Sequence, residues 1–217
     1  MRPRFALRGP ARLSALVVVA GLVLGACSST YTYVKNPQAR TFFKVPNDWR
    51  VFSEEEIFAR DIEGLSPQGE AATREAIWMV AFDASPHPSL DHLFEADAQA
   101  PHGFARVQPI SDQARDTFSL ATLRNILFPI DRVAQEDPGA VEILQNQDLV
   151  LDNGFHGSRI VFNIRRGTTF YTVNQTALVD PATRTLYLFV VGCEARCYVA
   201  NQDVIEDVVQ SWTVEER

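Results

Sequence analysis

Hydrophobic residues in the last third of the chain follow the two-residue period of β-strands. Between residues 159 and 165, Ile160, Phe162 and Ile164 face one side of a strand, whereas Arg159, Asn163 and Arg165 face the other. A continuous apolar run over residues 186–191 indicates a central strand that is buried on both faces. Turn sequences separate these runs from strand-like segments at 141–151 and 168–179: Asp152-Asn153-Gly154, Arg166-Gly167 and Asp180-Pro181-Ala182-Thr183. The pattern predicts an antiparallel meander of consecutive hairpins.

Near the C-terminus the hydrophobic period changes to that of a helix. Asp203 is followed three residues later by Glu206, a spacing typical of a reciprocal helix cap. The apolar stripe that follows consists of Val204, Ile205, Val208, Val209 and Trp212. This stripe is too apolar to remain in contact with water, so we expect the helix to dock on the sheet.

The segment between residues 41 and 140 mixes strands with short helices. Strands are predicted at 41–45, 76–84 and 104–110, the last of them at an edge or a bulge because it contains Pro109. Helices are predicted to begin after Ser53, Ser89 and Ser119, the first with Glu56 completing a capping box. Residues 61–72 are predicted to form a loop.

Together these elements define an α+β fold. Apolar strands need cover on both faces, and the predicted helices supply it. We therefore predict a mainly antiparallel sheet flanked by helices, in an α/β/α sandwich. About 175 residues without an internal repeat or a low-complexity linker suit one domain, which we place at residues 41–217.

The first 26 residues have the three-part pattern of a bacterial export signal. Arginines precede an apolar run at 13–26, which is shorter than the roughly 20 residues of a membrane-spanning helix. The residues Leu24-Gly25-Ala26-Cys27 resemble a lipobox, which implies cleavage before Cys27 and acylation of its sulfur and amino group. Two or more acyl chains anchor a protein stably, so we expect a lipoprotein on the extracytoplasmic face of the cell membrane. The alternative is an ordinary secretory signal with a chance cysteine.

The residues that follow the predicted signal are polar and show no period. We predict that residues 27–40 comprise the acylated cysteine and a flexible tether about 20 Å long. The folded domain would then lie close to the membrane surface.

The charge of the chain excludes one class of function. The formal net charge is −7; without the four arginines of the leader, 16 basic residues stand against 27 acidic ones, a net charge of −11. A domain with this balance is not expected to bind nucleic acid. Only Lys35 and Lys44 among the basic residues are lysines, a bias typical of GC-rich bacterial genomes such as those of actinobacteria.

The other two cysteines, Cys193 and Cys197, are expected to form a disulfide, because an exported chain meets an oxidising environment. In an extended strand they would be about 13 Å apart, so residues 194–196 must turn back and end the preceding strand. A redox-active dithiol is the alternative, although the spacing is not C-x-x-C. Metal binding by this pair is less expected still, because no histidine lies near it in sequence.

Three segments resemble the PsbP-like family. They are FKVPNDW at 43–49, DNGFHGSRIVF at 152–162, and the last strand and helix, LYLFVVGC with VIEDVVQSWTV. Among members of this family the chain is most similar to lipid-anchored bacterial proteins of the LpqN type. The resemblance implies an antiparallel sheet flanked by helices and a non-enzymatic accessory role. It transfers no catalytic residue, and it is weakest over residues 61–140.

The sequence contains no recognisable catalytic or cofactor motif. G-x-S-x-G, H-E-x-x-H, a phosphate-binding loop and a calcium loop are all missing, so we predict no catalytic residue and no cofactor. Three histidines, His87, His92 and His102, would bind a transition metal only if their loops converge. Their spacing is not that of metal ligands, and solvated loop positions are the simpler interpretation.

Three classes of function remain. We favour a non-enzymatic, lipid-anchored accessory module that binds an envelope protein, for which we expect an exposed apolar patch. A carrier of a lipid or small apolar ligand would instead need a largely apolar cavity. An envelope hydrolase or metalloenzyme would bring the three histidines together with carboxylates in one cleft.

Overall fold

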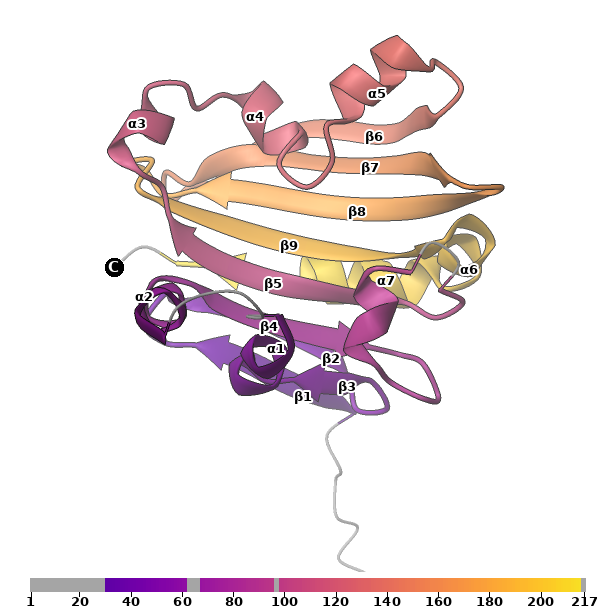
Figure 1. The fold of residues 1–217 in the computed structure, drawn as a ribbon, viewed down its shortest axis with the longest axis horizontal. Helices are drawn as coiled ribbons and strands as arrows, with labels where there is room; N and C mark the ends of the chain where they lie inside the picture. Colours follow the sequence, from indigo (N-terminus) through magenta and orange to yellow (C-terminus); the bar gives the residue numbers. More distant parts are fainter. Residues whose placement is uncertain (1–29, 62–66, 96–97, 216–217) are drawn as a thin grey trace, which may run out of the picture.

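Two antiparallel sheets form the centre of the fold (Figure 1). The structure, a computed structural model, describes residues 30–61, 67–95 and 98–215. The larger sheet has seven strands in the order β3-β4-β5-β9-β8-β7-β6, and the smaller sheet has three in the order β1-β2-β10. Helices flank the larger sheet, so the predicted α+β class is confirmed. The predicted export signal and Cys27 lie outside the described residues.

The predicted meander makes up one side of the larger sheet. Its strands are β6 (Val141–Val150), β7 (His156–Arg166), β8 (Thr169–Val179) and β9 (Thr185–Glu194), each antiparallel to the next. Gly154 and Gly167 have φ angles of +83° and +65° at the first two turns, a conformation that glycine adopts without steric cost. Strand β9 lies between β5 and β8 and is buried on both faces, as predicted for a central strand.

Three further strands complete the larger sheet: β3 (Arg50–Phe52), β4 (Trp78–Asp83) and β5 (His102–Pro109). Strand β4 is interior, as predicted, because it pairs with β3 and β5. The prediction of an edge strand or bulge at Pro109 is wrong, since β5 pairs on both sides. Proline is tolerated there because it follows the last pair with β4, Trp78 with Val107, and opposes β9 alone.

The smaller sheet corrects the predicted tether. Strand β1 (Tyr31–Asn36) pairs along its whole length with β2 (Thr41–Pro46), whose other edge meets β10 (Thr213–Val214). Residues 31–36 are therefore part of the fold and not a flexible linker. Val34 packs on the core, and the Asn36 Oδ1 accepts a hydrogen bond of 3.0 Å from the Ala39 N–H at the turn. Tyr, Thr and Val favour β-strands, but the overall polarity of this segment led to the prediction of a tether.

Of the two N-terminal helices, the sequence predicted the first and missed the second. Helix α1 (Glu54–Asp61) begins with the predicted capping box: the Glu56 N–H donates to Ser53 Oγ at 3.3 Å, and the Ser53 N–H donates to Glu56 Oε2 at 2.8 Å. The loop predicted at 61–72 is wrong over residues 67–72, because α2 (Pro67–Ala76) begins there; residues 62–66 lie outside the described residues. Proline suits the first turn of a helix, and the Glu, Ala and Arg residues that follow favour helix.

The remaining helices are short: η1 (Leu90–Leu93), α3 (Asp112–Arg115), α4 (Leu120–Arg124), α5 (Ile130–Glu136), α6 (Ala195–Ala200) and α7 (Gln202–Gln210). Helix α7 buries the predicted stripe through Ile205, Val208 and Val209. Its predicted cap is wrong, because Asn201 occupies the N-cap without a side-chain hydrogen bond. Glu206 instead accepts hydrogen bonds from Arg159 of β7.

The larger sheet has two buried faces with different covers. We call the face that carries Phe82, Phe189 and Val191 the back face; it packs against α6, α7 and the smaller sheet. The front face carries Phe162 and Leu188 and packs against α4 and α5. In Figure 1, α7 lies behind the sheet.

Candidate functional site

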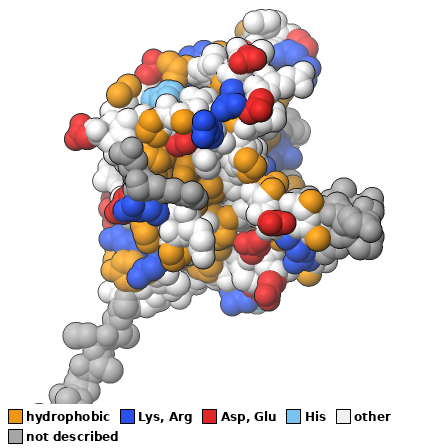
Figure 2. All heavy atoms as spheres, turned by 90° about the vertical axis from the view of Figure 1, so that its left-hand side faces the viewer, with side chains coloured by type: hydrophobic (Ala, Val, Ile, Leu, Met, Phe, Trp, Pro, Cys, Tyr) orange, Lys and Arg blue, Asp and Glu red, His pale blue; other side chains and the backbone are white. Residues whose placement is uncertain are grey.

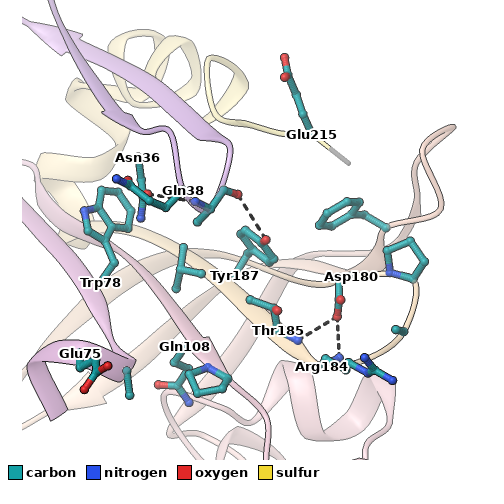
Figure 3. A pocket seen from close by; sticks show the side chains of 17 residues that line it. Asn36, Gln38, Glu75, Trp78, Gln108, Asp180, Arg184, Thr185, Tyr187 and Glu215 are labelled. Atoms are coloured by element: carbon teal, nitrogen blue, oxygen red, sulfur yellow. Dashed lines mark hydrogen bonds between the residues drawn. The ribbon is translucent and has the colours of Figure 1, made fainter. Parts of the chain in front are cut away.

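A cleft opens at one end of the molecule, where the two sheets meet (Figures 2 and 3). Its volume is about 740 Å³. Its walls come from the β1–β2 turn, the last turn of α2, the end of β5 and the β8–β9 turn. In Figure 2, hydrophobic side chains gather in the middle of this end, with charged side chains around them.

The floor of the cleft is aromatic and held in place by its neighbours. Trp78, Phe155 and Tyr187 line it, and the rings of Phe155 and Tyr187 meet edge to face at 5.4 Å. The Tyr187 hydroxyl donates to the Ala39 carbonyl at 3.3 Å and so joins the larger sheet to the β1–β2 turn. This contact is drawn in Figure 3.

The rim of the cleft is charged. Glu75, Arg184 and Glu215 belong to it, together with Asp180 of the β8–β9 turn. The Asp180 carboxylate is engaged in the turn itself, where its Oδ1 accepts from the backbone N–H groups of Arg184 at 2.6 Å and Thr185 at 2.8 Å. An aromatic floor with a charged rim suits a small molecule or peptide with an apolar body and polar ends.

Strand β6 forms an open edge of the larger sheet at the far side from β3. Its side chains are exposed over most of its length. Three are apolar: Ile143 is 49% exposed, Leu144 is 50% exposed and Val150 is 83% exposed. The register shifts between Ile143 and Gln145, so the bulge presents Ile143 and Leu144 next to each other. An open edge strand offers backbone N–H and C=O groups to a partner strand.

The structure brings two of the three histidines next to one carboxylate. Asp83 is 1% exposed and accepts hydrogen bonds from His92 Nδ1 at 2.6 Å and from the backbone N–H groups of Ser85 and Ser89. His102 lies directly opposite Asp83 in the β4–β5 pair. His87 is exposed, and its backbone N–H donates to Ser85 Oγ at 3.2 Å. Within the described residues, no group of three His, Cys, Asp or Glu side chains is arranged to hold a metal.

His102 is 2% exposed and pairs with Tyr171 in the core, so the solvated position expected for it is wrong. Its Nδ1 contacts the Ala100 carbonyl at 3.0 Å, so this nitrogen carries the proton and Nε2 accepts from the Tyr171 hydroxyl at 2.5 Å. Burial lowers the pKa of His102 and raises the pKa of Tyr171, because it disfavours the charged form of each. The pair therefore stays neutral near pH 7 and joins β5 to β8 within the core.

Cys193 and Cys197 are joined by a disulfide in the structure, with their Cα atoms 5.9 Å apart. The bond fixes the corner where β9 ends and α6 begins, as expected from the turn needed between them. Both cysteines are buried in the part of the core that lies on the back face of the larger sheet. The position indicates a structural crosslink more than a redox-active dithiol, which would need access to solvent.

Sequence reasoning missed Asp83 and the aromatic floor of the cleft. Asp83 ends the apolar segment 77–82, and a carboxylate at the end of a buried strand is a signal that could have identified it. Trp78, Phe155 and Tyr187 come from three distant segments. Their convergence depends on tertiary structure and has no local signal.

Comparison with known proteins gives similarity in structure but not in sequence. No family model and no curated protein matches the chain. The solution structure of cyanobacterial PsbP from Synechocystis sp. PCC 6803 is similar to it, with 14% identity, 88% of this chain and 98% of that chain covered, and a TM-score of 0.49. The crystal structure of LpqN, involved in cell envelope biogenesis of Mycobacterium tuberculosis, has 12% identity, 88% coverage of each chain and a TM-score of 0.45. These are the two kinds of protein that the sequence segments resemble.

Among the described residues, no helix combines the length and hydrophobicity needed to span a membrane.

Proposed function

We propose that the chain is a lipid-anchored accessory module on the extracytoplasmic side of a cell membrane, where it binds an envelope protein through strand β6. The anchor is the acylated Cys27 implied by the lipobox-like sequence. The module acts by contact, without a catalytic step of its own.

The open edge of β6 is the observation that carries this proposal. Ten residues form the strand, and a partner strand can pair with its free backbone groups while its side chains meet Ile143 and Leu144. Proteins commonly protect such edges by keeping them short or charged, because exposed apolar edges associate. Strand β6 carries Glu142 and Asp148 but still exposes its apolar pair, which favours a selective contact.

A photo-crosslinking experiment in intact cells tests the proposal. Amine crosslinkers would miss most of the domain, because the chain contains only two lysines, Lys35 and Lys44. A photoreactive amino acid at Gln147 on β6 should capture one envelope protein reproducibly, and one at Asp203 on α7 should not. Leu144→Glu should abolish the crosslink from Gln147, because it places a charge in the apolar contact.

The matched control is Val199→Glu, which adds the same charge at an apolar side chain that is 73% exposed on α6. This variant should retain the crosslink. The proposal fails if no protein is captured at abundant expression, or if both glutamate variants lose the crosslink equally.

The cleft supports a second candidate, a carrier of a small molecule. Its volume of about 740 Å³ and its aromatic floor favour this function, although the charged rim differs from the largely apolar cavity expected for a lipid. A panel of amphipathic small molecules tested by thermal shift should then include a stabiliser whose effect is lost in Trp78→Ala. The same ligand should stabilise Leu144→Glu normally.

A further inference from the structure

The outer face of the smaller sheet carries both lysines of the chain among aromatic residues. Alternate residues of a strand point to the same side, so Tyr31, Tyr33 and Lys35 of β1 share this face with Phe42, Lys44 and Pro46 of β2. We call these six residues the Tyr-Lys face. The intervening Val34, Phe43 and Val45 point inward and pack on the back core.

The Tyr-Lys face is exposed at Tyr33 and Lys35 and partly exposed at its other four residues, and it combines two chemistries. Tyr33 is 63% exposed and lies opposite Lys44, whose ammonium sits 4.0 Å from the centre of the Tyr31 ring. A shallow hollow of about 180 Å³ runs between Tyr33, Phe42 and Lys44. Tyrosine rings are typical of the membrane–water interface, and lysines are attracted to anionic lipid headgroups.

The charges of this face contrast with those of the whole chain. Strands β1 and β2 contain no acidic residue, although the sequence has 27 of them. Glu54 and Glu75 border a separate hollow that Lys35 also lines, at the side of the face. Lys44 and the three aromatic side chains lie away from that hollow.

The position of the face in the chain links it to the anchor. Strand β1 begins at Tyr31, four residues after Cys27, and four residues span at most about 14 Å. A lipid on Cys27 would therefore hold the smaller sheet at the bilayer. In Figure 1, β1 and β2 lie at the opposite side of the molecule from β6.

We propose that the Tyr-Lys face rests on the anionic bilayer in which the chain is anchored. This contact orients the domain so that β6 points away from the membrane, towards its partner. The inference rests on the proposed lipid anchor and adds a defined docking face and orientation to it.

Labelling of the two lysines tests this directly. The lipidated full chain is reconstituted into vesicles of phosphatidylglycerol and phosphatidylcholine, or kept in detergent, and exposed to a water-soluble amine-reactive ester. Mass spectrometry then follows Lys35 and Lys44 on separate peptides. Labelling of both should be at least about fivefold slower in the vesicles, because two lysines at an anionic surface favour the docked state by about thirtyfold.

Two introduced lysines serve as controls. Gln147→Lys on β6 should be labelled equally in vesicles and detergent. Arg50→Lys on β3 lies outside the face but only three residues after Asn47, whose N–H donates to the Thr30 carbonyl at 3.1 Å, so its labelling reports nearness to the membrane alone. Tyr33→Ser should accelerate labelling of Lys35 and Lys44 in vesicles, whereas Val150→Ser, which removes an exposed apolar side chain on β6, should not.

The two proposals fail in different ways. A Cys27 peptide without lipid overturns the anchor, and this inference with it. A lipidated protein whose Lys35 and Lys44 are labelled equally fast in vesicles and detergent overturns the docking face alone. Equal slowing of Lys35, Lys44 and the lysine introduced by Arg50→Lys also overturns it, because nearness to the bilayer would then explain the protection.

Discussion

The two faces of the larger sheet are covered in opposite ways. The back cover combines the smaller sheet with α6 and α7, and the Cys193–Cys197 disulfide joins α6 to the sheet. The front cover consists of α4, with five residues, which lies against β7 and β8, and α5, with seven, which lies against β6. Helices this short are not stable in water by themselves, so the front cover depends on its contacts with the sheet.

The back cover also ties the two ends of the domain together. The Trp212 ring stacks on Phe189 with centroids 5.3 Å apart, and its Nε1–H donates to Thr41 Oγ1 at 2.8 Å. The Lys44 N–H donates to Ser211 Oγ at 3.0 Å. Residues more than 160 positions apart are thus joined within one layer, and we expect this layer to open only with the whole domain.

The front cover has fewer attachments. Leu123 and Ile130 are its fully buried apolar side chains among the residues of α4 and α5. The buried Gln175 of β8 adds a polar contact, since its Nε2 donates to the Leu123 carbonyl at 2.9 Å. We therefore expect the front cover to open at lower free-energy cost than the back cover.

The largest expected effect comes from substituting two adjacent residues of β9, one on each face of the larger sheet. Phe189 and Leu188 are both fully buried, on the back and the front face respectively. Phe189→Ala should lower the free energy of unfolding in urea by about 3–5 kcal/mol and Leu188→Ala by about 2–5 kcal/mol, because each leaves a cavity. Hydrogen exchange should then show faster opening of residues 120–136 in Leu188→Ala alone. Unchanged exchange of residues 120–136 in Leu188→Ala would contradict the expectation that the front cover opens more easily than the back cover.

The disulfide of the back cover gives the next largest effect. Replacing both cysteines, Cys193→Ser with Cys197→Ser, should lower the free energy of unfolding by about 2 kcal/mol, since the bond closes only a short loop in the unfolded chain. Urea unfolding with and without reductant measures this. Reductant should destabilise the wild type and leave the double variant unchanged. If reductant also destabilised the double variant, the effect could not be assigned to the Cys193–Cys197 bond.

A smaller effect should appear at the front cover. Gln175→Leu removes the donor to the Leu123 carbonyl and leaves that carbonyl buried without this partner, while it also removes the unpaired Gln175 Oε1. The net loss should be about 1 kcal/mol. Exchange of the α4 amides should accelerate before any change in α7. Equal acceleration in both helices would mean that the two covers open together.

The sequence predicted the sheet better than its covers. Strands β6 to β9 follow local alternation and turn signals such as Gly154 and Gly167, because neighbours in sequence are neighbours in this part of the sheet. Strand β1 and helix α2 were missed, because their sequences are polar and the contacts that stabilise them are tertiary. The prediction that Glu206 takes part in the cap of α7 failed because a tertiary contact competes with it: Arg159 of β7 binds that carboxylate.

The candidate site could be predicted only in fragments. The disulfide was predicted from the spacing of its two cysteines and from the export signal expected at the N-terminus, both of which can be read directly from the sequence. The cleft needs Trp78, Phe155 and Tyr187 from three segments, and its geometry depends on the β8–β9 turn. The histidines show the limit most clearly: His92 reaches Asp83 across nine residues because η1 folds back over the strand end, and no periodicity indicates that return.

The smallest expected effect is a pH dependence of the back cover. Hydrogen bonds from Arg159, one of them 2.9 Å long, lower the pKa of Glu206 from its ordinary value of 4.5. The folded protein thus binds a proton at Glu206 less readily than the unfolded chain does. Its stabilising contribution is complete above pH 4.5 and is lost as the pH falls through the lower, folded-state pKa.

Glu206→Gln should therefore reduce the free energy of unfolding by about 1 kcal/mol or less at pH 7, and this difference should shrink in acid. Urea unfolding of both proteins between pH 7 and pH 3 measures it. The neighbouring variant Asp207→Asn, on an exposed position of α7, should show no such convergence with the wild type. A Glu206→Gln difference that is constant with pH would assign its effect to packing instead of charge. The Gln175 contact of the front cover does not titrate, so its own contribution to stability should stay constant over the same pH range.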